Sequence, residues 1–314
     1  MNCDACCLKP FYFEANKAPL LFKRLGHSGH MEALTSAEIR QAVELALEED
    51  VGNGDVTTLA TVPENVHAKA VMRARQELVV AGLKLAEAAF SELSSGVEIT
   101  RDREDGGRVV AGATLLRIAG PARALLSAER VALNFVQHLS GIATLTARFV
   151  EAIRGTRAQI LDTRKTIPGW RRFEKYAVSC GGGRNHRMGL YDMVLIKDNH
   201  LAALRAEPGG AVAAAIQRSR KAYPSLKVEI EADTLEQVDE ALAAGADLIL
   251  LDNMNPSQLR SAVQKCKDRA RTEASGGVNL ESVRAVAEAG VDFISVGALT
   301  HSAPAVDIGL DFEL

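Results

Sequence analysis

Residues 228–252 read VEIEADTLEQVDEALAAGADLILLD, and this stretch decides the fold. It begins with an apolar run at 228–230, continues with an amphipathic helical pattern at 235–244, and ends with a second apolar run at 248–251. Continuous apolar strands joined by amphipathic helices are typical of parallel strands with right-handed crossover connections. The same alternation fills the second half of the chain.

Six apolar runs after residue 155 predict strands, at 159–161, 193–196, 228–230, 248–251, 271–274 and 293–296. Helices are predicted between them at 235–244, 256–267 and 280–289. A βα barrel is the natural closure of such units, but six strands fall short of the eight of a full barrel. We therefore expect an α/β fold that ends in an incomplete or modified barrel.

The first half has a different, α+β pattern. The segment Thr35-Ser36-Ala37-Glu38 has the form of a capping box and predicts a helix that runs to about residue 49. Strands are predicted at 67–80, 97–100 and 113–118, and a helix at 82–93. Residues 123–153 predict two helices that link the halves, separated at Ser140-Gly141.

These patterns divide the chain into three parts. Residues 1–30 show neither a helical nor a strand periodicity, and we predict that they form a flexible extension. Residues 31–155 form the first domain with its linking helices. Residues 156–314 form the barrel-like domain. A return of its last residues to the first domain is left open.

The composition excludes several classes of protein. With 37 Lys and Arg against 40 Asp and Glu the net charge is −3, which argues against a general attraction to nucleic acid or anionic membranes. The 47% hydrophobic and 25% charged residues are ordinary for a folded globular chain. No run approaches the roughly 20 apolar residues that span a bilayer, and residues 1–30 lack the pattern of a signal peptide, so a cytoplasmic location is expected.

The five cysteines predict no disulfide framework. The spacing of Cys3 and Cys6 suits a zinc site, but no second pair follows, and an incidental tail is the preferred interpretation. Cys180 lacks an evident activating partner and is interpreted as a small packed residue. The Gly181-Gly182-Gly183 run beside it allows either close backbone approach or a mobile loop.

Polar groups or glycines follow every predicted strand of the second half. In βα barrels functional groups lie at the carboxyl ends of the strands, so these positions predict a site. Four of them recur at Glu231, Asp252, Ser275 and Gly297, at the length of one βα unit, which places them side by side on one rim. The other groups are Asp162-Thr163-Arg164-Lys165 and Lys197-Asp198-Asn199-His200.

The residue types at this rim indicate a phosphorylated anion. Backbone N–H groups at Ser275-Gly276-Gly277 and Gly297-Ala298 offer a pocket for phosphate. A basic cluster implies several negative groups, more than one phosphate would need; it comprises Arg164, Lys165, His186, Arg187 and Lys197. Glu231 and Asp252 suit sugar hydroxyls, a divalent metal or a developing cation. A solvated basic face and structural salt bridges are the alternatives.

The sequence closely resembles one known family, that of quinolinate phosphoribosyltransferase, also called nicotinate-nucleotide pyrophosphorylase (carboxylating). The resemblance covers about residues 31–314. It rests on DTRKT at 162–166, GGGRNHR at 181–187, LIKDNH at 195–200, EIE at 229–231, LDN at 251–253 and EASGG at 273–277, with SAER at 127–130 and HLSGIAT at 138–144 upstream.

The resemblance implies a decarboxylating transfer in de novo NAD biosynthesis. Quinolinate and phosphoribosyl pyrophosphate give nicotinate mononucleotide, pyrophosphate and CO2, with Mg²⁺ required. The implied fold is an N-terminal α/β sandwich followed by an open, incomplete α/β barrel. The implied assembly is a homodimer with a shared active site, and further assembly into a hexamer is left open.

The resemblance also implies roles for the site residues. Arg164, His186, Arg187 and the partner subunit's Arg130 would clamp the two carboxylates of quinolinate. Lys165 and Lys197 would neutralise the pyrophosphate. Glu231 and Asp252 would hold the ribose hydroxyls near a magnesium ion held mainly by substrate. The expected catalytic residues are Lys165, Lys197, Glu231 and Asp252, and the expected phosphate contacts are Ser275, Gly276, Gly277, Gly297 and Ala298.

Two other hypotheses fit parts of the pattern. Lys165 or Lys197 at a strand end could form a Schiff base in an aldolase. A non-catalytic relative could bind a phosphorylated or carboxylated ligand at the same rim. The presence of both the basic clamp and the two rim carboxylates counts against a mere binding protein.

Overall fold

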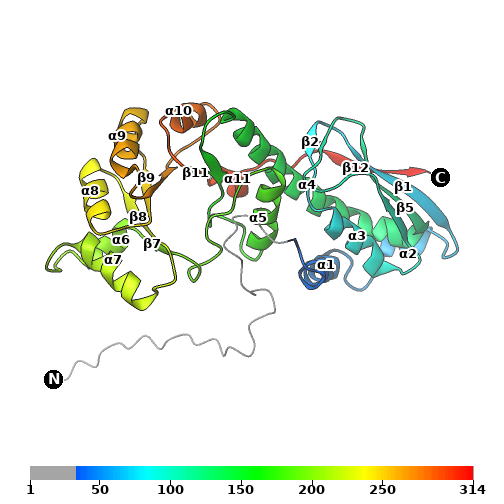
Figure 1. Cartoon of the computed structure of the whole chain (residues 1–314). Coiled ribbons are helices and arrows are strands. Elements are labelled where there is room, and N and C mark those ends of the chain that lie inside the picture. The colour runs from blue at the N-terminus through cyan, green and yellow to red at the C-terminus, as the bar shows by residue number, and fades with distance from the viewer. Residues whose placement is uncertain (1–32, 314) are drawn as a thin grey trace, which may run out of the picture.

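The computed structural model describes residues 33–313. The predicted extension over 1–30, with Cys3 and Cys6, lies outside the described residues. The described chain forms two lobes that meet at the long helix α4 (Ala122–Ala152) (Figure 1). Within residues 33–313, none of the helices combines the length and the apolar character that crossing a membrane requires.

The first lobe packs helices against one antiparallel sheet. The sheet order is β12-β1-β5-β3, with bounds β12 (Ile308–Glu313), β1 (His67–Ala74), β5 (Thr114–Pro121) and β3 (Glu98–Arg101). The short strands β2 (Leu78–Val79) and β4 (Arg108–Val109) form a separate pair. The helices are α1 (Ser36–Asp50), α2 (Val56–Thr61), α3 (Leu83–Leu93) and the first part of α4. This arrangement is an α/β sandwich.

Helix α1 begins where the sequence predicts. The Thr35 hydroxyl accepts from the backbone N–H of Glu38 at 3.2 Å, and the Glu38 carboxylate accepts from the backbone N–H of Thr35 at 2.8 Å. This reciprocal pair satisfies two backbone donors that a helix start leaves free. Val43 and Leu47 follow on the buried face of the helix.

The prediction of two linking helices is wrong, because α4 is a single helix across Ser140-Gly141. Gly141 is there for close packing: a Cβ at this position would lie 2.2 Å from the carbonyl oxygen of Pro304. The buried Ser140 hydroxyl accepts from the N–H of Ala81 and donates to its C=O. Small residues inside α4 therefore let two other segments approach it without ending the helix.

The second lobe is a six-stranded parallel sheet in the order β6-β11-β10-β9-β8-β7. Its strands are β6 (Gln159–Leu161), β7 (Val194–Ile196), β8 (Val228–Ala232), β9 (Leu248–Asp252), β10 (Arg271–Ser275) and β11 (Phe293–Ser295). The order ends at β6 and β7 instead of joining them, so the barrel is open and incomplete, as expected. The rim formed by the carboxyl ends of these strands is called the strand-end rim below.

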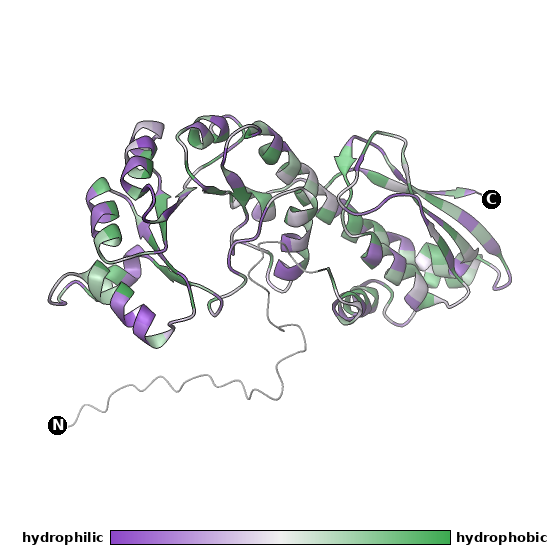
Figure 2. Ribbon diagram, in the orientation of Figure 1, coloured by the Kyte–Doolittle hydropathy of each residue, from purple (hydrophilic) through white to green (hydrophobic). Residues whose placement is uncertain are grey.

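Helices alternate with these strands. They are α5 (Arg171–Cys180), α6 (Asp198–Ala203), α7 (Ala211–Ala222), α8 (Leu235–Ala243), α9 (Pro256–Cys266), α10 (Val283–Glu288) and α11 (Ala298–His301). Their surfaces carry both hydrophilic and hydrophobic residues around the turns (Figure 2). The apolar faces of α7, α8 and α9 bury Ile216, Val238 and Leu259. Helix α10 starts later than predicted, because the Asn279 side chain accepts from the backbone N–H groups of Glu281 and Ser282 and forms a turn first.

After β11 the chain crosses back to the first lobe. Strand β12 pairs antiparallel with β1, from Lys69 with Glu313 to Ala74 with Ile308. The Gln137 side chain of α4 donates to the carbonyl of Ile308 at 2.7 Å. The last strand therefore forms an edge of the first sheet.

Candidate active site

The strand-end rim brings most of the predicted residues together. Lys165 follows β6, Lys197 follows β7, and Gly297 follows β11, while Glu231, Asp252 and Ser275 lie at the ends of β8, β9 and β10. Since the strands are parallel, all these ends lie on the same edge. The Cδ atom of Lys165 is 3.1 Å from the position that a Cβ on Gly297 would take, so β6 and β11 meet here.

The rim carboxylates form a cluster beside Lys197. The ammonium of Lys197 donates to Glu231 at 2.6 Å. Glu231, Asp233 and Asp252 each offer an oxygen within 4.8 Å of the others. Burial raises the pKa of Asp252, and the charges of Glu231 and Asp233 raise it further. A set of carboxylate oxygens is the donor set that Mg²⁺ prefers, so these residues fit that ion.

Two arginines form the opposite, basic part of the site. Burial lowers the pKa of Arg187, and the neighbouring positive charge of Arg164 lowers it further. The buried Nε of Arg164 has no hydrogen-bond partner within residues 33–313. The Arg187 guanidinium donates to the carbonyl of Met193 at 3.3 Å. Two adjacent guanidinium groups with spare donors favour a bound anion with more than one carboxylate or phosphate group.

Asp162 was predicted among the rim groups, but it lies in the interior and supports the fold. It is fully buried and forms an ion pair with the fully buried Lys175 of α5. The same carboxylate accepts from the backbone N–H of His186 at 2.9 Å, and Lys175 also donates to the carbonyl of His186 at 3.0 Å. The Asp162–Lys175 pair therefore fixes the loop that carries His186 and Arg187.

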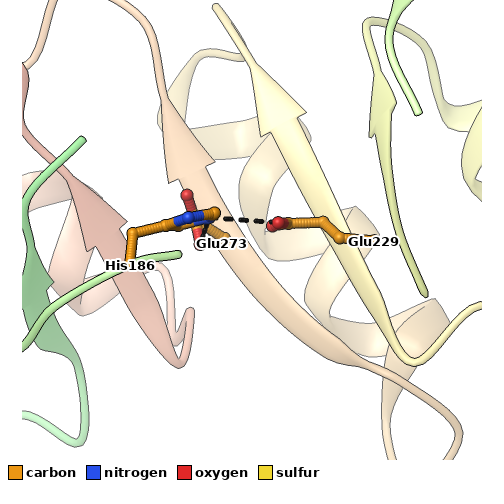
Figure 3. A group of neighbouring side chains, drawn as sticks. All are labelled: His186, Glu229 and Glu273. Carbon is orange, nitrogen blue, oxygen red and sulfur yellow. Dashed lines mark hydrogen bonds and ion pairs between the residues drawn. The ribbon is translucent and has the colours of Figure 1, made fainter. Parts of the chain in front are cut away.

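The ring of His186 points toward two buried glutamates, Glu229 and Glu273 (Figure 3). Its Nε2 is 3.1 Å from Oε2 of Glu229 and 3.4 Å from Oε2 of Glu273. Burial lowers the pKa of His186, but Glu273 and Glu229 outweigh this effect and raise the pKa to about 10. Burial and the charge of Glu273 raise the pKa of Glu229 to about 7. The carboxylate-clamp role predicted for His186 stays a prediction.

Arg130 does not share this rim. It is exposed on α4, one turn after Ser127, whose hydroxyl donates to Asp55 at the start of α2. Its predicted role depends on a second subunit.

The glycines of the site serve close packing and turns. A Cβ on Gly276, where φ is +96°, would lie 2.2 Å from Oδ1 of Asn253. Gly181 and Gly183 let the end of α5 approach α4, since Cβ atoms there would lie 2.4 Å from the Ala143 carbonyl and 2.8 Å from Thr146. The triple-glycine segment therefore allows close packing of α5 against α4 and is not a loop without contacts.

Cys180 fits the packed role predicted for it. Burial raises the pKa of its thiol to about 12, and the charge of Asp105 contributes. A thiol with so high a pKa holds too little thiolate at neutral pH to act as a nucleophile.

Glu229 and Glu273 are the site residues to which the sequence reasoning gave no role. Both stand at buried positions inside strands, two residues before Glu231 on β8 and Ser275 on β10. Alternation in a strand places residues two apart on the same face. A carboxylate at that spacing below a rim residue was the signal that could have identified them.

An open α/β barrel with carboxylates, lysines and paired arginines on one rim defines an enzyme site for a strongly anionic ligand. Comparison with known sequences is more specific. Residues 55–140 match the N-terminal domain model of quinolinate phosphoribosyl transferase, and residues 142–311 match its C-terminal domain model. The chain belongs to the quinolinate phosphoribosyltransferase family.

Known relatives are similar to this chain over nearly their whole length. The chain is 48% identical over 278 residues to the nicotinate-nucleotide pyrophosphorylase [carboxylating] of Mycobacterium leprae, covering 87% of this chain and 96% of that protein. It is 43% identical over 267 residues to the probable enzyme of the same name in Bacillus subtilis, covering 85% and 90%. The solved nicotinate-nucleotide pyrophosphorylase from Francisella tularensis superposes with a TM-score of 0.85 at 36% identity, covering 90% and 99%.

Removing the buried cation from the Asp162–Lys175 pair tests how the His186 loop is held. Lys175→Met leaves a buried carboxylate without its counter-charge, a change that costs about 3–5 kcal/mol. We expect urea denaturation followed by circular dichroism to show a free energy of unfolding lower by about that amount. Lys221→Met, at an exposed position of α7, is the matched control, with an effect within about 0.5 kcal/mol. A loss below about 1 kcal/mol in Lys175→Met would contradict the structural role of the pair.

Proposed function

We propose that this protein transfers the phosphoribosyl group of phosphoribosyl pyrophosphate to quinolinate with decarboxylation. The products are nicotinate mononucleotide, pyrophosphate and CO2, a step of NAD biosynthesis. The observation that carries the proposal is the pairing of Arg164 and Arg187, whose neighbouring charges and spare donors suit a dicarboxylate, opposite a rim of carboxylates and lysines that suits a phosphorylated sugar. The 48% identity to a named carboxylating pyrophosphorylase supports the same reaction.

Quinolinate recognition falls to the basic part of the site. Arg164 and Arg187 bind the two carboxylates through charge-assisted hydrogen bonds, which relieves the repulsion between the two guanidinium groups. The partner subunit's Arg130 completes the clamp in the homodimer, because Arg130 is exposed on α4 and free to reach another subunit. Direct contact of His186 with quinolinate stays a prediction, because its ring nitrogens face the two buried glutamates and the backbone N–H of Arg187.

The phosphate groups bind at the other strand ends. Lys165 and Lys197 neutralise the pyrophosphate, and the ammonium of Lys197 is already oriented by Glu231. The turns at Ser275-Gly276-Gly277 and Gly297-Ala298 present backbone N–H groups to the 5′-phosphate. The positive φ values of Gly276 and Gly277 allow such a turn.

The rim carboxylates act on the sugar. Glu231 and Asp252 accept hydrogen bonds from the ribose hydroxyls and favour the positive charge that develops on C1 as pyrophosphate leaves. Together with Asp233 and the substrate pyrophosphate, they would hold a magnesium ion. Bound Mg²⁺ supplies charge neutralisation on the leaving pyrophosphate.

The pyridine nitrogen of quinolinate then bonds to C1 of the ribose. Positive charge on that nitrogen stabilises the electron pair left on the adjacent ring carbon when CO2 departs, and a proton replaces CO2 there. The protein positions both substrates and screens their charges, and no covalent enzyme intermediate is required. The Lys197 side chain is engaged in an ion pair with Glu231, which counts against a Schiff base at that lysine. The cytoplasmic location, the homodimer and any hexamer stay predictions.

The reaction is tested by incubating the purified protein with quinolinate, phosphoribosyl pyrophosphate and Mg²⁺ and detecting nicotinate mononucleotide by mass spectrometry. A parallel tube contains nicotinate in place of quinolinate, and another omits Mg²⁺. We expect product from quinolinate with Mg²⁺ and not from nicotinate. A folded protein that makes no product from quinolinate would refute the assignment.

The clamp assignment predicts a selective loss in Arg187→Ala. Each charge-assisted contact is worth roughly 1.5–3 kcal/mol, so quinolinate binding should weaken by about 10- to 150-fold. Nicotinate, with one carboxylate, should lose much less. Isothermal titration calorimetry measures both, with Arg260→Ala on the exposed face of α9 as the control. Equal losses for the two ligands would count against the clamp.

A shared active site predicts complementation between two inactive variants. Arg130→Ala and Lys197→Ala homodimers should each lose activity, and mixing them should restore part of it, because one site of the heterodimer keeps both wild-type residues. Differently tagged subunits allow heterodimers to be purified before the assay. Verified heterodimers without activity would contradict a site that uses the partner subunit's Arg130.

A further inference from the structure

A second polar layer lies beneath the rim of the barrel. Glu229 stands two residues before Glu231 on β8, and Glu273 stands two residues before Ser275 on β10, so each faces the same side of the sheet as the rim residue above it. Barrel interiors are usually filled by branched apolar side chains. Two carboxylates that are at most 1% exposed are therefore a departure that needs a physical reason.

The two glutamates are only partly satisfied by the fold. The Ser295 hydroxyl donates to Oε1 of Glu273, and Oε2 of Glu229 faces the His186 ring. Within the described chain, Oε1 of Glu229 and Oε2 of Glu273 have no hydrogen-bond partner. Burying carboxylates in this way costs free energy, which their attraction to nearby cations offsets.

The groups that face them belong to the quinolinate clamp. The Nε2 edge of His186 lies against both carboxylates, and its Nδ1 accepts a hydrogen bond from the backbone N–H of Arg187 at 2.7 Å. The ring thus links the two buried carboxylates to the main chain of Arg187. The charge of Glu229 also favours the charged form of Arg187 and opposes the effect of Arg164 on it.

We propose that Glu229 and Glu273 are positioning residues for quinolinate recognition, which hold the His186 ring against the backbone of Arg187 and keep the two clamp arginines together before the dicarboxylate binds. This inference rests on the proposed function and deepens it. The glutamates act through His186 and Arg187 and do not touch the substrate. Their effect is confined to the quinolinate part of the site, since Lys197 at the rim is held by Glu231 instead.

Positioning and simple charge repulsion predict opposite changes in quinolinate affinity when these glutamates are replaced. Replacing a buried glutamate by glutamine removes a negative charge near a bound dianion, and Coulomb attraction alone would then tighten quinolinate binding. Lost positioning weakens it. For Glu229→Gln, Glu273→Gln and the double variant we expect the KM for quinolinate to rise at least tenfold, with the KM for phosphoribosyl pyrophosphate within twofold of wild type.

The control is Glu240→Gln, which changes an exposed glutamate on α8. The variant Glu229→Asp keeps the negative charge and should recover part of the quinolinate affinity that Glu229→Gln loses. Calorimetric titration with quinolinate and the ¹⁵N shifts of the His186 ring at one fixed pH report positioning without turnover. A wild type that binds quinolinate but makes no product would contradict the proposed function and leave these readouts in place. Tighter or unchanged quinolinate binding in a folded double variant, or equal rises in both KM values, would overturn the positioning role.

Discussion

The buried ion pair between Asp162 and Lys175 is the constraint on which the site depends. It joins the first strand of the barrel to α5, and its carboxylate and ammonium both bind the backbone of His186. Its neighbours on α5 extend the same principle, since the buried Arg172 pairs with Glu38 of α1. A buried charged pair thus joins α5 to α1, beside the stacked rings of Phe135 on α4 and Trp170 before α5.

The site separates opposite charges by depth and by side. On the rim, Asp252 and Glu231 end the neighbouring strands β9 and β8, while Lys165 and Lys197 follow β6 and β7 at the two ends of the sheet. Arg164 and Arg187 are close enough to affect each other's charge, and Glu229 and Glu273 lie one layer below the rim. A substrate pair with two carboxylates, a phosphate and a pyrophosphate needs such a division, because one uniformly basic pocket would bind each anion in several orientations. The net charge of −3 shows that this basic region is local.

The sequence was sufficient for the parts that depend on period and spacing. Apolar runs located all six barrel strands, and the capping box located α1. The repeated interval of rim residues predicted their shared edge. Packing against distant segments could not be read in this way: Gly141 looked like a helix break because its partner Pro304 is far along the chain. Asp162 looked like a rim ligand because its ion pair with Lys175 of α5 leaves no mark in the local pattern after β6.

The return of β12 to the first sheet makes the order of synthesis matter. Strand β1 pairs with β12, which is translated over two hundred residues later. During synthesis the first sheet therefore has an open edge until the barrel has been translated. Pairings so distant in sequence form slowly, and an unpaired edge exposes backbone donors and acceptors to other chains. The two lobes are therefore distinct in structure but finish folding as one unit.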